Sequence, residues 1–141
     1  MSSPAAELAA LYRRDLARLV RQLDALDDAR LWQVLPGVTN SAGNLLLHLN
    51  GNLREFAATG VPRAEMTAAL TELASLIPGV IERVPDATWD TPFPENVLGE
   101  PLTNRQFVVH LYGHLNYHLG QIDYLRRVLT GEGALAPPTK K

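Results

Sequence analysis

Apolar side chains recur at steps of three and four residues through most of the chain, and this spacing constrains the fold more than any other feature. A helix gathers such positions on one face, which is then buried against a neighbouring helix. Four segments have this pattern, about 5–29, 42–59, 63–84 and 103–130. No segment has the alternation of a half-buried strand. The spacing therefore predicts an all-α fold.

Local signals set the ends of these helices. Residues 35–41 contain a Pro-Gly turn followed by capping residues, before the second helix. Thr103 with Gln106 three residues later fits a capping box and opens the last helix. Pro78 removes a backbone donor inside the third segment, but the apolar spacing resumes in phase after it. We expect one kinked helix there.

The long connection before the last helix completes the predicted architecture. Residues 85–102 include four prolines and one glycine, so we expect a loop there that serves as a crossover or a lid. Four amphipathic helices in 141 residues predict one domain, an antiparallel four-helix bundle spanning 1–141. Residues 131–141 are expected to form a flexible tail.

Composition narrows the function classes. The formal net charge is −2, and Lys and Arg are scattered without a basic stripe, so a nucleic-acid partner is not expected. No apolar run approaches the roughly 18 residues that span a bilayer, so no membrane is expected and a cytoplasmic location is the default. The chain has no cysteine, which leaves imidazole and oxygen as the ligands for any metal ion.

Three of the four histidines lie in the stretch HLYGHLNYHLGQ, residues 110–121. His114 and His118 are one helical turn apart, and two imidazoles at this spacing can chelate a divalent ion. His48 lies midway along the second predicted helix. Two facing helices could bring it to the pair, giving three protein ligands and an open position. Hydrogen-bonded core histidines without a metal remain the competing interpretation.

His110 fits this site less well. An i, i+4, i+8 row drifts around a helix by about 40° per step, so three successive turns do not converge easily on one ion. A fourth ligand, a supporting donor and a packed side chain are all open for His110. We favour a supporting or packing role over a ligand role.

Amide side chains near the histidines could orient them. Asn44 and Asn52 flank His48 by one turn on either side, and Gln121 follows His118 by three residues. The asparagines could instead form hydrogen bonds between helices. Glu55 is about two turns from His48, and no carboxylate is close enough in sequence to name as a general base.

Glycines interrupt the predicted helices beside the histidines. Gly51, Gly113 and Gly120 are each unfavourable inside a helix by roughly 1 kcal/mol relative to alanine. Close packing of helices or room for a ligand could offset this cost, and we expect close packing for Gly113 and Gly120.

Two segments resemble one known family. NSAGNLLLHLNGNLREF (40–56) and HLNYHLGQIDYLRR (114–127) are similar to the DinB-like superfamily of four-helix metal proteins. Members carry one histidine on the second helix and an H-x-x-x-H-x-G-Q segment on a later one. The resemblance implies a homodimer that binds a divalent ion, zinc or nickel most often, through His48, His114 and His118.

The resemblance also implies functions. Some members are metal-dependent transferases or isomerases that activate a low-molecular-weight thiol toward an electrophilic substrate. The alternative is a non-enzymatic metal-binding or stress-related protein, since many members have no known activity. A bundle with a vestigial metal site is the third possibility. The sequence does not choose among these three.

Overall fold

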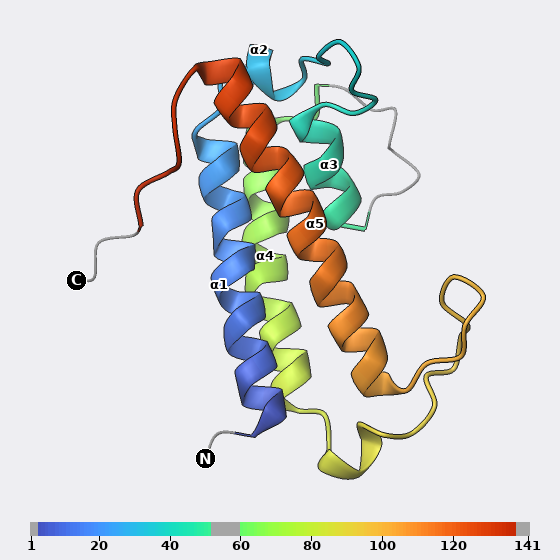
Figure 1. The fold of residues 1–141 in the computed structure, drawn as a ribbon. Coiled ribbons are helices and arrows are strands. Elements are labelled where there is room, and N and C mark those ends of the chain that lie inside the picture. Colours follow the sequence, from blue (N-terminus) through green and yellow to red (C-terminus); the bar gives the residue numbers. More distant parts are fainter. Residues whose placement is uncertain (1–2, 52–59, 138–141) are drawn as a thin grey trace.

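The computed structural model describes residues 3–51 and 60–137, and this part of the chain is helical without a strand (Figure 1). The expected all-α class is confirmed. The elements in chain order are α1 (Pro4–Asp24), α2 (Asp28–Leu31), α3 (Ala42–Leu49), α4 (Arg63–Glu82), the 3-10 helix η2 (Asp86–Thr88) and α5 (Asn104–Thr130).

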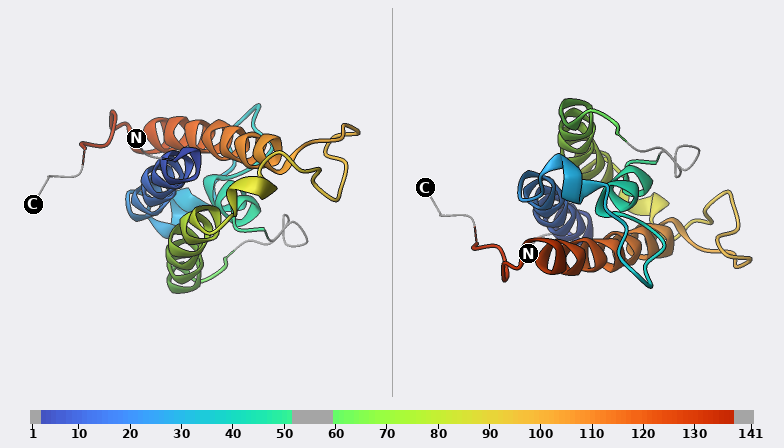
Figure 2. Two further views of the ribbon diagram at one scale, coloured as in Figure 1. Left: turned by 90° about the horizontal axis from the view of Figure 1, so that it is seen from below. Right: turned by 90° about the horizontal axis from the view of Figure 1, so that it is seen from above.

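Helix α1 packs against both α4 and α5, and α3 packs against α5 (Figure 1). Helices α1 and α4 run in opposite directions, as do α3 and α5. Viewed from either end, α5 lies along one side of the molecule and α4 lies across α1 from it (Figure 2). The largest fully buried apolar side chains include Leu19, Leu23, Leu31, Leu46 and Ile122. Met66, Leu70 and Ile81 of α4 are also buried, so the core draws on all five described helices α1 to α5.

The first helix is shorter than expected. It ends at Asp24, and a second short helix, α2, begins at Asp28. The reason is local, because the Asp27 side chain accepts a hydrogen bond from the Arg30 amide and caps a new helix. Leu26 remains buried on the connection.

Helix α3 begins as the sequence indicated but ends early. The Ser41 side chain accepts from the Asn44 amide, and Asn44 Oδ1 accepts from the Ser41 amide, which completes a capping box. The helix ends at Leu49, and Gly51 has a φ of 89°, a conformation that favours glycine. The prediction of one helix from 42 to 59 is therefore wrong after Leu49. Residues 52–59, which include Asn52 and Glu55, lie outside the described part.

Helix α4 is continuous through Pro78, as the in-phase spacing predicted. Among the described helices it is the one that is long and apolar enough to cross a membrane, by length and composition only. Met66, Leu70 and Ile81 are buried, and core helices of soluble proteins pass the same test. The absence of a membrane partner therefore stays a prediction.

The connection before α5 is a loop, as expected. It contains η2 and two isolated bridges, Pro92 to Thr103 and Val97 to Glu100. Thr103 and Gln106 form the predicted capping box at the start of α5. At its other end, Gly131 stops the helix with a φ of 73°. These caps fix the start and the length of the helix that carries three histidines.

Gly43 marks a close approach that the sequence did not indicate. A Cβ built on this glycine in α3 would lie 2.6 Å from two ring carbons of Trp32. Trp32 ends α2, so this contact sets how close α2 lies to the start of α3. Gly113 and Gly120 differ, because a Cβ at either position meets nothing within 4 Å. The prediction of close packing at these two glycines is therefore wrong.

Gly43→Ala should destabilise the fold by about 1–3 kcal/mol, because the new methyl group overpacks the contact with Trp32. Gly113→Ala, in an open helical position, should raise stability by about 0.5–1 kcal/mol. Urea denaturation of both variants measures the two effects. In a Trp32→Ala background the Gly43→Ala penalty should disappear, and its persistence there would contradict the steric explanation.

Candidate metal centre

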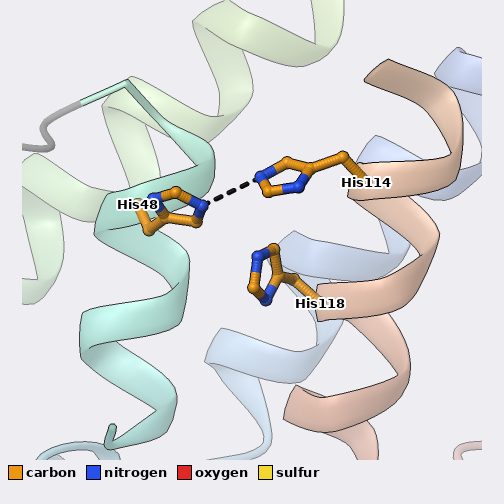
Figure 3. Close-up of side chains that lie close together, drawn as sticks. All are labelled: His48, His114 and His118. Atoms are coloured by element: carbon orange, nitrogen blue, oxygen red, sulfur yellow. Dashed lines mark hydrogen bonds between the residues drawn. The ribbon is translucent and has the colours of Figure 1, made fainter. Parts of the chain in front are cut away.

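Three histidines from two helices converge on one point (Figure 3). His48 comes from α3, and His114 and His118 come from α5. The Nε2 atoms of His48 and His114 are 2.8 Å apart, and one ring nitrogen of each histidine lies within 4.8 Å of the other two. The three centroid separations are 4.5, 4.8 and 4.9 Å, with the rings nearly perpendicular. The structure thus brings together the three residues singled out from the sequence.

The convergence follows from two capped helices and their packing. The Ser41 box fixes the phase of α3, which places His48 in its last turn, facing α5. The one-turn spacing of His114 and His118 directs both rings toward α3. Leu115 and Leu119 of α5 are buried beside them and hold the helix against its neighbours.

The surroundings favour neutral imidazoles. Partial burial lowers the pKa of His48, and the neighbouring His118 lowers it further. Burial is also the largest cause of the lowered pKa of His114, followed by His118, His48 and His110. A protonated imidazole cannot bind a metal ion, so both shifts keep ring lone pairs available near neutral pH.

Gln121 orients His118. Its side-chain oxygen lies 2.7 Å from His118 Nδ1. An amide oxygen only accepts, so Nδ1 carries the proton and Nε2 presents a lone pair. This bond confirms Gln121 as a partner of a site histidine and is the kind of support that metal-binding histidines receive.

The donor set suits a divalent transition metal. Three imidazole nitrogens bind zinc, nickel, copper or iron, and in a tetrahedral site they leave one position open. Within residues 3–51 and 60–137, no Asp or Glu joins this group. Tetrahedral ligands 2.0–2.1 Å from an ion are about 3.4 Å apart. The His48 and His114 nitrogens are therefore already close enough, and small ring rotations would separate them.

The remaining candidates have other positions. His110 is exposed and is not part of the three-histidine group, in line with the role outside the ligand set. Asn44 lies at the other end of α3 from His48, in the capping box.

A hydrogen-bond network that no sequence pattern reveals fixes α5 beside the site. Asp15 of α1 is fully buried and accepts hydrogen bonds from Arg14, Arg18 and the Tyr112 hydroxyl. Burial raises the pKa of Asp15, but the bonds from Arg14 and Tyr112 outweigh it and hold the pKa below its usual value. Tyr112 is two residues before His114, so this carboxylate anchors the helix that carries two site histidines.

Comparison with known proteins gives no identification. No family model matches the chain. No curated protein and no solved structure matches it either. The function proposed below therefore depends on the three histidines and on the motifs around them.

Proposed function

We propose that this protein binds a divalent metal ion, zinc or nickel, through His48, His114 and His118. The convergence of three imidazoles from two helices, with His48 and His114 66 residues apart in sequence, supports the proposal most directly. The proposal includes an antiparallel four-helix bundle of the DinB-like kind. The opposed directions of α1 and α4 and of α3 and α5 support that arrangement. The homodimer implied by the resemblance and the cytoplasmic location expected from the composition stay predictions.

We further propose that the site serves a transfer reaction in which the sulfur of a low-molecular-weight thiol forms a new bond to an electrophilic substrate, while the thiol proton is lost to solvent and the substrate releases its leaving group. A divalent ion bound there would supply Lewis acidity, which would lower the pKa of a thiol and so leave the thiol ionised at neutral pH. The chain contributes neutral ring nitrogens, and Gln121 keeps the His118 proton on Nδ1. Because the chain has no cysteine, the sulfur nucleophile must come from a cosubstrate.

A second candidate is a metal-binding protein without enzymatic activity. One observation favours it, because the three-histidine group includes no carboxylate from the described residues that could act as a general base. Assays that supply bacillithiol, mycothiol or glutathione with an electrophilic acceptor separate the two candidates. Transfer that requires the metal supports the enzyme, and its absence with all three thiols supports the binding protein.

Metal content tests the proposal that both candidates share. Purified protein stripped with a chelator and reloaded with zinc or nickel should bind about one ion per chain, measured by mass spectrometry and calorimetry. Binding to the folded state alone should add about 2.7 kcal/mol of stability at a free metal concentration 100 times Kd. Absence of a bound ion, together with an unchanged melting temperature, would overturn the metal-binding function.

A further inference from the structure

A groove of about 700 Å³ runs between α1 and α5, away from the histidines. Residues after α5 form part of its wall, because the chain turns back beside α1 beyond Gly131 (Figure 1). Arg126 donates to the Gly133 carbonyl, and Arg21 donates to the Ala136 carbonyl. The described part of the predicted flexible tail, 131–137, therefore lies against the bundle.

The groove is distinct from the metal centre. On α5 its lining residues are Asn116, Leu119, Gly120, Asp123 and Arg127. At 100° per residue, the polar members and Gly120 lie about half a turn around the helix from His114 and His118. The histidines face α3 and the groove faces α1, so a ligand in one does not touch the other.

Positive charge dominates the lining. It includes Arg14, Arg18, Arg21 and Arg127, against Asp123 alone. Arg14 and Arg18 both pair with the buried Asp15, yet their side chains remain 53% and 54% exposed. Two guanidinium groups thus share one carboxylate, and one net positive charge remains beside the groove.

The carboxylate in the lining already has hydrogen-bond partners. Asp123 accepts hydrogen bonds from Gln22, Arg126 and Arg127. Arg21 is bonded to a neutral carbonyl, and within the described residues no salt bridge joins it to an acid. Arg127 of α5 is paired with Asp123, whereas Arg21 of α1 has no acidic partner among the described residues and keeps its positive charge beside the groove.

Apolar surface lies between the arginines. Ala17, Leu119 and Leu135 line the groove, and Gly120 leaves open space where a side chain would stand. Small-molecule sites combine apolar walls with a few charged groups and have volumes of about 300–1,000 Å³. Arginine forks bind carboxylate and phosphate oxygens through paired hydrogen bonds. The lining therefore suits a ligand with an anionic head and an apolar body.

We propose that this groove binds a small organic anion, with its acidic head at Arg18 and Arg21 and its apolar body over Leu119 and Gly120. Carboxylate, phosphate and sulfonate heads share the required chemistry. The proposal uses no residue of the metal centre and stands independently of the proposed function.

Two dyes with similar aromatic bodies test it. The anionic dye 8-anilinonaphthalene-1-sulfonate should bind the full chain, measured by fluorescence titration and calorimetry. The neutral analogue N-phenyl-1-naphthylamine lacks the sulfonate and should bind at least about tenfold more weakly. Competition by decanoate and by decyl phosphate then distinguishes a carboxylate preference from a phosphate preference. Equal affinity for the two dyes would overturn the proposal.

Substitutions locate the binding. Gly120→Leu should fill the groove and weaken dye binding by about tenfold or more, while Gly113→Leu, two turns earlier on the same face and outside the lining, should not. Arg18→Gln should weaken binding of the anion by about tenfold and leave the neutral dye unchanged. Circular dichroism checks that each variant folds. If Gly120→Leu does not fold, Arg18→Gln decides the question.

The metal centre provides a further control. Dye affinity should be the same before and after treatment with a chelator, because the groove and the histidines lie on opposite sides of α5. Loss of dye binding on chelation, or full binding by Arg18→Gln, would place the dye elsewhere and would reject the groove as an anion site.

Discussion

Replacing His114 with alanine should abolish stoichiometric metal binding. His114 contributes one of the three converging ring nitrogens, and its Nε2 is 2.8 Å from that of His48. Two imidazoles would remain, on different helices, and water would have to supply the other ligands. We expect affinity to fall by more than the roughly 10- to 100-fold that loss of a ligand's outer partner costs. Calorimetric titration of the chelator-treated variant with zinc measures the loss.

Two further variants show whether the loss is specific. Gln121→Ala keeps all three histidines but removes the bond to His118 Nδ1, so affinity should fall by about 10- to 100-fold. His110→Ala removes an exposed imidazole on the same helix and should leave affinity unchanged. A His114→Ala protein that still bound one ion per chain would show that the ligand assignment is wrong. Loss of metal binding in His110→Ala would show that the ligand assignment is incomplete.

Much of the site could be predicted because its determinants are local. His114 and His118 are one turn apart on a helix whose start is fixed by Thr103 and Gln106, so their common direction follows from spacing. The pairing with His48 was a hypothesis about packing, and the structure brings the ring to the pair. Capping and periodicity therefore sufficed for each half of the site, while joining the halves required the contact between α3 and α5.

The features that the sequence did not predict depend on interactions between distant residues or on single side chains. The break after Asp24 depends on one cap at Asp27, within apolar spacing that continues through Leu26. Scattered arginines gave no basic stripe, yet Arg14, Arg18 and Arg21 share one face of α1 and meet Arg127 across a groove. Their i, i+4, i+7 spacing was a usable signal for half of that groove. The other half depends on where the chain goes after α5.

Asp15 stands among the charged residues between the apolar positions of the first helix, yet it is fully buried. A buried carboxylate is retained where partners satisfy it, and here Arg14, Arg18 and the Tyr112 hydroxyl do so. Tyr112 is far from Asp15 in sequence, so helical periodicity could not reveal the pairing. A polar residue at the edge of an apolar face is compatible with either placement.

Asp15→Asn should destabilise the protein by about 1.5–3 kcal/mol at neutral pH, because charge-assisted hydrogen bonds from Arg14 and Tyr112 would be replaced by weaker neutral ones. The matched control is Asp24→Asn, an exposed aspartate on the same helix, which should change stability by less than about 0.5 kcal/mol. Urea denaturation of the two variants and the unmodified chain measures both.

The pH dependence of this difference separates a charge effect from a packing effect. The hydrogen bonds hold the folded-state pKa of Asp15 below its usual value of 3.8, even though burial raises it. The ionised carboxylate therefore stabilises the fold fully above the unfolded-state value, and this contribution is lost as pH falls through the folded-state value. The difference in free energy of unfolding between the unmodified protein and Asp15→Asn should be constant above about pH 5 and should become smaller below about pH 4. A gap that stays the same down to pH 3 would show that Asp15 acts through its shape and not through its charge.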